Sequence, residues 1–284
     1  MKDSPHLQLG ANEAAEALRW WIRAGVDCAL GETPPNRFAD SATGARHGAA
    51  VAPAAAPERS APAPDMGSPV RQSAAQVGPP EASETQARAL AAAATDLETL
   101  KSLMANFDGC ALKRTATQLV FADGVPGSST MFVGEAPGGD EDRIGRPFVG
   151  RAGQLLDRML NAVGLDRRQV YIANIIPWRP PGNRTPTLQE TQTCLPFIKR
   201  QIELADPEFL VCLGGSSAQT LLGVKGGILR ARGSWFTFQR EGGRTIPALA
   251  MLHPAYLLRQ PAHKRLAWAD MRALASELRS SRRQ

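Results

Sequence analysis

The chain has 284 residues, of which 43% are hydrophobic, and its 33 Lys and Arg exceed its 27 Asp and Glu to give a formal net charge of +6. This length and apolar content allow one sizeable core and a small extra element. Residues 1–85 contain 7 of the basic and 10 of the acidic side chains, so the positive charge belongs to the remainder. A basic folded region attracts polyanions, which makes nucleic acid a candidate partner; the alternative is a soluble basic protein without one.

Cysteine spacing and hydropathy exclude several classes. The four cysteines, Cys28, Cys110, Cys194 and Cys212, are scattered without a CxxC pair, which argues against a disulfide framework and against a zinc site. No apolar run reaches membrane-spanning length, and the first residues lack the apolar stretch of a signal peptide. We therefore expect a protein of the reducing cytoplasm without a membrane contact.

The first predicted element is an amphipathic helix within residues 1–30. Apolar residues recur on one face at spacings of three and four: Ala15, Leu18, Trp21, Ile22 and Val26. Two interpretations stay open, docking on the main domain or binding a repair or replication partner. Residues 31–85 are rich in Ala, Pro, Ser and Gly without an apolar period, which predicts a disordered linker.

The third region, residues 86–284, predicts one α/β domain. It opens with a helical pattern over 86–106. Four short apolar runs, typical of buried strands, follow at 130–136, 169–175, 208–214 and 247–253, and helical patterns separate them at 151–163, 187–204 and 216–223. Strands alternating with helices predict a mostly parallel sheet covered on both faces.

In such sheets the ligand sits outside the carboxyl ends of the strands. The expected strands end in Gly134-Glu135, in Asn174, in the glycine–serine segment 214–217 and in His253. These four ends supply a carboxylate, an amide, a helix start and a histidine, and together they outline a site.

Asn174 carries a donor and an acceptor side by side. Uracil presents its O4 acceptor beside its N3–H donor, whereas cytosine reverses this pattern, so a site built on Asn174 would reject cytosine. The alternative is that Asn174 only caps or turns the chain. His253 could hydrogen-bond an oxygen on which negative charge develops, or it could be a structural histidine.

Other residues near the strand ends suit DNA. Ser216 and Ser217 start a helix whose free N–H groups could hold a phosphate, although serine is also an ordinary helix cap. The stretch 256–259 combines apolar side chains with a cation, which suits a wedge that enters a base stack, or equally the first turn of a core helix.

The stretch FVGEAPGGDEDRIGRPFVG, residues 132–150, places a glycine-rich turn after an apolar run, as phosphate loops do. The acids Asp140, Glu141 and Asp142 follow at once and would repel a phosphate. No lysine follows the glycines, which excludes a P-loop.

Five motifs in this order and spacing closely resemble family 4 uracil-DNA glycosylases of bacteria and archaea: GEAPGGDED, GRPFVGRAGQLLDRML, YIAN, RPPGNRTP and HPAYLLRQP. The likeness runs from about Leu97 to Asp270. It implies a three-layer α/β/α fold with a central four-stranded parallel sheet. It also implies hydrolysis of the N-glycosidic bond of uracil in DNA, which leaves an abasic site for base excision repair. We separately expect a monomer that is associated with the nucleoid.

The resemblance also implies roles for individual residues. Phe148 would stack on the flipped uracil, Asn174 would read its O4/N3 edge, and Glu141 would line the pocket near that edge. His253 would stabilise the departing uracil anion at O2, and Glu135 would help to place the attacking water. The expected DNA contacts are Arg146, Arg184, Ser216, Ser217, Tyr256, Leu257, Leu258 and Arg259.

The pocket is also expected to include Gly134, Ala136 and Gly138. In the better-known family of these enzymes, the position of Ala136 holds an aspartate that orients the water, so here catalysis would depend more on stabilising the leaving group. The position of Gly138 holds a tyrosine that excludes thymine there, so thymine must be rejected otherwise, for example by Glu141.

One departure from the family concerns its 4Fe–4S cluster, which four cysteines hold. Cys110 and Cys194 match two of the positions, but Phe107 and Trp178 occupy the other two. Two thiolates cannot hold a cluster that takes four. We expect no cluster, aromatic packing in its place, and chemistry that needs no metal or other cofactor.

Two alternative functions stay open. The glycine at position 138 would suit a glycosylase with a wider range of deaminated bases, such as hypoxanthine and xanthine. A relative that binds uracil in DNA without cleaving it is the other alternative, against which Glu135, Asn174 and His253 argue.

Overall fold

The computed structural model describes residues 80–241 and 243–281. The helix expected within residues 1–30 and most of the expected linker lie outside these residues. The domain opens with α3 (Pro80–Ala93), which begins before the expected boundary at residue 86 because a proline is well suited to a first helical turn. The single helix predicted over 86–106 is two helices. Asp96 caps α4 (Leu97–Asn106) by accepting a hydrogen bond from Thr99 N at 2.7 Å, which breaks the helix there.

The sheet has six strands in the order β1-β3-β2-β4-β6-β5. The strands are β1 (Asp123–Gly124), β2 (Thr130–Gly134), β3 (Tyr171–Asn174), β4 (Phe209–Leu213), β5 (Trp235–Gln239) and β6 (Thr245–Met251). The four central strands are parallel and lie within two residues of the predicted bounds. The edge strands β1 and β5 pair antiparallel and were not predicted.

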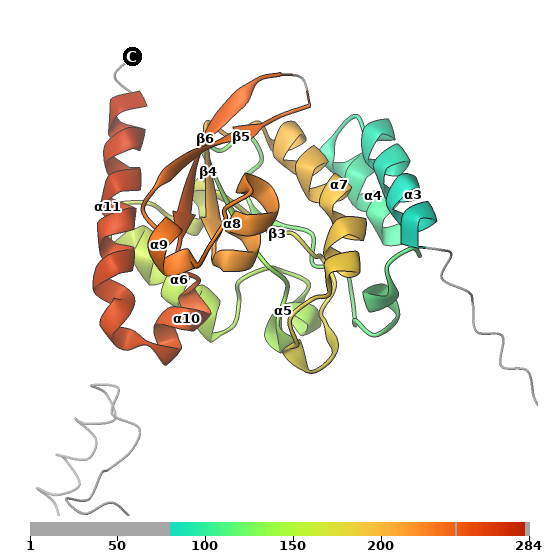
Figure 1. The fold of residues 1–284 in the computed structure, drawn as a ribbon, viewed down its shortest axis with the longest axis horizontal. Helices are drawn as coiled ribbons and strands as arrows, with labels where there is room; N and C mark the ends of the chain where they lie inside the picture. Colours follow the sequence, from blue (N-terminus) through green and yellow to red (C-terminus); the bar gives the residue numbers. More distant parts are fainter. Residues whose placement is uncertain (1–79, 242, 282–284) are drawn as a thin grey trace, which may run out of the picture. The chain divides into compact units, whose positions relative to one another are not determined.

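The remaining helices connect and cover the strands (Figure 1). They are α5 (Gly139–Ile144), α6 (Arg151–Asn161), α7 (Leu188–Ala205), α8 (Gly215–Leu222), α9 (Ile228–Ala231), α10 (Pro254–Arg259) and α11 (Lys264–Ser281), with short 3₁₀ turns η1 (Ala111–Arg114), η2 (Arg167–Gln169), η3 (Pro181–Asn183) and η4 (Pro261–His263). Three of these confirm predicted helices within two residues: α6, α7 and α8. Among the described residues, none of the helices combines the length and apolarity needed to span a bilayer.

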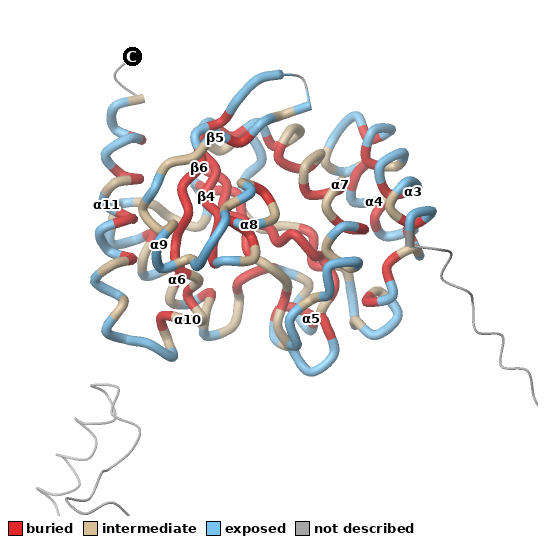
Figure 2. Tube along the Cα trace, viewed as in Figure 1, coloured by how far each residue is buried: buried red, intermediate tan, exposed pale blue. Residues whose placement is uncertain are grey.

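Successive residues of β2 point to opposite faces of the sheet. Met131 and Val133 belong to a buried cluster with residues of α3, α4, α7 and α8, whereas Phe132 belongs to a second cluster with residues of α6 and α11. All three side chains are fully buried, since helices cover both faces (Figure 2). The fold is therefore a three-layer α/β/α sandwich around a central parallel sheet, as predicted.

The sheet register brings the carboxyl ends of the central strands together. Gly134 pairs with Asn174 at the ends of β2 and β3, and Leu213 pairs with Met251 near the ends of β4 and β6. Gly214 N donates to Met251 O at 2.8 Å, which keeps the last two chain segments side by side beyond the strands. The loops that leave these ends form one continuous site.

Candidate active site

A cavity of about 560 Å³ opens at the carboxyl ends of the parallel strands. It gathers most of the predicted site residues, namely Glu135, Ala136, Gly138, Glu141, Phe148, Asn174, Arg184, His253, Tyr256 and Arg259. The apolar wall of this cavity, which includes Ile228 and Leu252, was not predicted. Ile228 lies within a glycine-rich stretch, KGGILRARG, that carries no recognisable motif.

Gly134 lies between the two side chains expected to hold a base. A Cβ atom on Gly134 would come within 2.5 Å of Asn174 Oδ1 and 2.6 Å of Phe148 Cζ, so this position can hold only glycine without a shift of both. Asn174 is buried, and within the described part of the chain its Oδ1 has no hydrogen-bond partner. A buried acceptor costs free energy when it is unpaired, so this site favours a planar ligand that brings an N–H donor.

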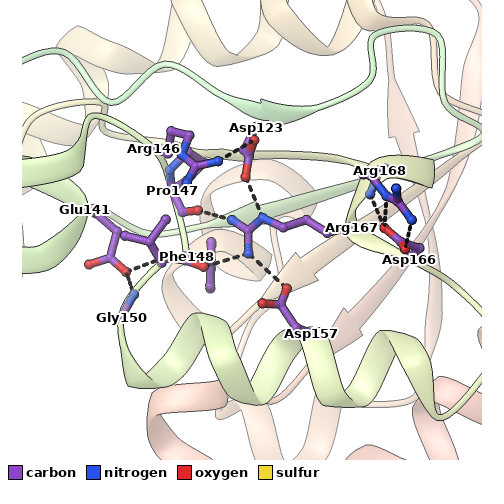
Figure 3. A network of polar contacts seen from close by, with 11 residues as sticks. Asp123, Glu141, Arg146, Pro147, Phe148, Gly150, Asp157, Asp166, Arg167 and Arg168 are labelled. Carbon is purple, nitrogen blue, oxygen red and sulfur yellow. Dashed lines mark hydrogen bonds and ion pairs between the residues drawn. The ribbon is translucent and has the colours of Figure 1, made fainter.

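Glu141 braces the loop that carries Phe148. Its Oε1 accepts hydrogen bonds from Val149 N and from Gly150 N, both at 2.9 Å, the latter labelled in Figure 3. Its Oε2 accepts one from Gly138 N at 3.1 Å. Glu141 thus lines the cavity, as expected, but its oxygens are engaged by backbone. Its Oε2 also lies 2.8 Å from where a Cβ of Gly138 would stand, so the carboxylate occupies the space that the missing side chain leaves.

His253 is held in one tautomer by its place at the start of α10. Its Nδ1 accepts a hydrogen bond from Ala255 N at 3.1 Å, as a helix cap does. Burial first, and then the charge of Arg259, lower the pKa of His253 to about 4. The ring is therefore neutral near pH 7, and its proton is on Nε2, where it can be donated. The ring centroid is 5.5 Å from that of Phe148, with 31° between the planes.

Glu135 supplies a carboxylate to the same cavity. Burial raises its pKa, and a hydrogen bond from the neighbouring Ser216 side chain opposes this shift. Among the described residues, Glu135 Oε1 has no hydrogen-bond partner. An unpaired carboxylate oxygen at this edge can accept a proton from water or face a developing positive charge.

The residues expected to contact DNA divide into two groups. Arg259 is exposed and Tyr256 is half-buried, and both line the cavity, so these two are available at its rim. Leu258 is half-buried. Leu257 is 1% exposed and packs with Leu252 and Ala267, so the alternative of a core helix describes it correctly. The expectation that Leu257 contacts DNA is therefore wrong, because the helical phase of α10 turns its side chain into the core.

The two serines differ from expectation, whereas the two remaining arginines stay compatible with it. Ser217 is fully buried and donates to Gly214 O at 3.1 Å, so the structure does not support a DNA contact for it. The Ser216 side chain hydrogen-bonds Glu135. Arg184 is paired with Glu190 at 2.6 Å, and Arg146 lies 4.0 Å from Asp123; both arginine side chains remain substantially exposed.

The four positions that the resemblance assigns to a cluster lie together in the core. Cys194 Sγ donates a weak hydrogen bond to Cys110 Sγ at 3.8 Å. The rings of Phe107 and Trp178 stack with centroids 6.5 Å apart, and Phe197, one turn beyond Cys194 on α7, packs edge-on to Phe107 at 5.1 Å. All five residues are buried. Two sulfurs and two rings that cannot ligate iron do not fit a group that takes four thiolates. Across residues 80–241 and 243–281, no three metal-ligating side chains gather at one point.

Comparisons with known proteins point to one superfamily. A family model described as "Uracil DNA glycosylase superfamily" matches residues 121–272. The chain is similar to the type-4 uracil-DNA glycosylase of Pyrobaculum aerophilum, with 39% identity over 59% of this chain and 87% of that protein. It is also similar to the type-4 enzymes of Archaeoglobus fulgidus (41% identity, 54% of this chain, 78% of that one) and Thermotoga maritima (40% identity, 55% and 79%).

Proposed function

This chain belongs to the uracil DNA glycosylase superfamily, and we propose that it is a type-4 uracil-DNA glycosylase that flips uracil out of DNA and hydrolyses its N-glycosidic bond. The observation that carries this proposal is the buried Asn174 Oδ1 beside the Phe148 ring, an oxygen that has no hydrogen-bond partner among the residues that the structure describes. A flipped uracil would stack on Phe148 and donate its N3–H to this oxygen. The amide N–H of Asn174 would then reach O4, which completes a pattern that cytosine cannot match.

His253 would act on the leaving group. As the C1′–N1 bond breaks, its electron pair moves to uracil and spreads onto O2. A neutral imidazole with its proton on Nε2 can donate a hydrogen bond to this oxygen without transferring the proton. A preorganised donor of this kind stabilises the transition state more than the bound substrate, which is what accelerates the reaction.

Glu135 would act on the sugar side. As C1′ becomes electron-poor, the carboxylate would stabilise the positive charge and orient a water molecule. The water oxygen forms the new bond to C1′, and its proton passes to the carboxylate or solvent while the uracil anion takes up a proton. Because an alanine stands at position 136, where the better-known family has its water-orienting aspartate, Glu135 is the carboxylate left for this task.

The test is release of free uracil from oligonucleotide duplexes without added metal. Duplexes with U·G, U·A, hypoxanthine·T and T·G are compared under one condition. We expect uracil release from both uracil duplexes and none of the corresponding base from the other two. Release of hypoxanthine would support the wider range, and tight uracil-dependent binding without release would support a non-catalytic relative.

We also propose a partner, an oligomeric state and a location for the protein. Uracil-containing DNA is the proposed partner, because the basic charge of the chain lies outside residues 1–85. We further propose a monomer that acts at the nucleoid in the cytoplasm, with residues 1–30 available to a repair or replication protein.

We propose that the protein works without an iron–sulfur cluster. The argument is the donor set of two thiols and two aromatic rings at the four positions. Packing of these rings would supply stability that a cluster supplies elsewhere, since a buried aromatic pair contributes about 0.5–1.5 kcal/mol beyond its burial.

The iron content of the protein and a variant without the two cysteines test the absence of a cluster. Protein purified anaerobically is expected to contain far less than one iron per chain. Cys110→Ala with Cys194→Ala should keep uracil release within about threefold of wild type, because only small buried side chains change, at a cost of about 1–3 kcal/mol in stability. Iron analysis, visible absorbance and thermal unfolding check this. Stoichiometric iron that the double variant loses would contradict it.

A further inference from the structure

Arg167, in the turn η2, connects three parts of the chain (Figure 3). Its guanidinium donates to Asp123 Oδ2 at 2.5 Å, on the edge strand β1, and to Asp157 Oδ1 at 3.0 Å, on helix α6. It also donates to Phe148 O at 2.7 Å and to Pro147 O. One planar side chain thus ties the loop of the stacking residue to a strand and a helix.

Phe148 needs such a hold because of its backbone. Its φ is +54°, in the left-handed region that residues with a Cβ atom rarely occupy. A conformation of this kind persists where the surroundings determine it. Helix α6 also packs directly against this peptide, since a Cβ on Gly153 would lie 1.7 Å from Phe148 O.

Hydrogen bonds with two side chains hold the backbone on both sides of Phe148, one through its carbonyl groups and the other through its N–H groups. Arg167 binds the carbonyl groups of Pro147 and Phe148, and Glu141 binds the N–H groups of Val149 and Gly150. Together they fix where the Phe148 ring stands. Glu141 lines the cavity, whereas Arg167 does not, so Arg167 can act on a ligand only through the loop.

We infer that Arg167 is a positioning residue that holds the base-stacking face of Phe148 and thereby sets the affinity of the pocket for uracil. This inference rests on the proposed function, because a stacked base is what the ring would receive. Asp123 and Asp157 orient the guanidinium and pair its charge. The expected consequence is weaker capture of the flipped base with little change in bond cleavage once the base is seated.

The neighbouring Arg168 is a matched control. It pairs with Asp166 within its own turn, through contacts at 2.7–3.1 Å, and its side chain is 87% exposed. It carries the same charge on the same turn, yet its contacts stay within that turn and away from the loop of Phe148 (Figure 3). Arg168→Met therefore removes a charge without removing the hold on the loop.

The experiment compares Arg167→Met, Arg167→Lys and Arg168→Met by steady-state kinetics, inhibition by free uracil, and binding to undamaged duplex. Arg167→Met should raise KM and the inhibition constant of uracil about tenfold, with kcat within about threefold, because stacking holds the ground and transition states alike. Arg167→Lys should recover only part of this, since an ammonium cannot span four acceptors. Arg168→Met should leave kcat and the inhibition constant of uracil unchanged.

If Arg167→Met fails to fold, Asp157→Asn provides the same test, since it removes one orienting carboxylate from a half-exposed position. A smaller shift in the same direction is then expected. An unchanged uracil constant in the folded variant, or a fall in kcat alone, would overturn the inference. Absence of uracil release by the wild-type protein would instead overturn the proposed function.

Discussion

Replacing His253 with alanine is expected to lower kcat for uracil release by about 100- to 1,000-fold, the usual effect of removing a preorganised donor from a developing anion. The reason for this loss is that the imidazole of His253 is neutral and donates a hydrogen bond. Its Nδ1 is engaged by Ala255 N, so Nε2 carries the only ring proton, and this proton faces the cavity where O2 of uracil would lie. The KM for DNA should change much less.

His253→Asn separates this role from the helix cap. Asparagine is a good N-cap, so it retains the hydrogen bond to the start of α10 but lacks the reach of the imidazole. Both variants should lose kcat equally, whereas only the alanine variant should lose about 1 kcal/mol of stability. Single-turnover kinetics and urea unfolding measure the two effects. A slow alanine variant beside a fully active asparagine variant would show that His253 is only structural.

The lowered pKa of His253 makes the stability of the folded protein depend on pH. The pKa of His253 is lowered to about 4 in the folded protein, against about 6.5 in the unfolded chain, so the unfolded chain binds more protons between these values. The stability contributed by the neutral ring is complete above about pH 6.5 and is lost as pH falls towards 4. Wild type should therefore lose more stability than His253→Asn over this window, while its kcat shows no step near pH 6.5.

The central sheet could be predicted because parallel strands are buried on both faces and appear as continuous apolar runs. The two edge strands, β1 and β5, could not be predicted. β1 has only two residues, and in β5 only Phe238 is buried. Helix α11 was also missed, although Met271 and Leu274 complete one layer of the core.

The site was predictable where a strand end fixes a residue. Asn174 ends one parallel strand, and Glu135 and His253 follow the carboxyl ends of two others, so topology alone brings them to one edge. The orientations of Ser217 and Leu257 depended on helical phase, since one residue along a helix turns a side chain by about 100°. Both point into the core.

Arg167 could not be predicted because its partners are distant in sequence. Asp123 lies 44 residues before it, on an edge strand that was itself missed, and the carbonyl of Phe148 lies 19 residues before it. The role of Glu141 is similar in kind. Its sequence position predicts a pocket wall, whereas only the folded loop reveals that its oxygens bind backbone N–H groups.

Asn174→Asp should reduce kcat/KM for uracil release about 100-fold or more at neutral pH, since a site built on a donor and an acceptor rejects the wrong pattern strongly. The change preserves size in a position that is 4% exposed and pressed against Gly134. It replaces the N–H donor with an oxygen, which would face O4 of uracil and repel it. Asn161→Asp, on the exposed end of α6, is the control and should retain activity.

Acid should restore part of the activity of this variant. Burial raises the pKa of a carboxyl group, and the introduced carboxyl group, once protonated, would again offer one O–H donor and one carbonyl acceptor in the arrangement of the original amide. The deficit relative to wild type should therefore shrink as pH falls from about 7.5 to about 5. A deficit that is constant over this range would show that the variant fails for another reason, such as a displaced Phe148. A deficit that shrinks would identify the donor to O4 as the group the site requires.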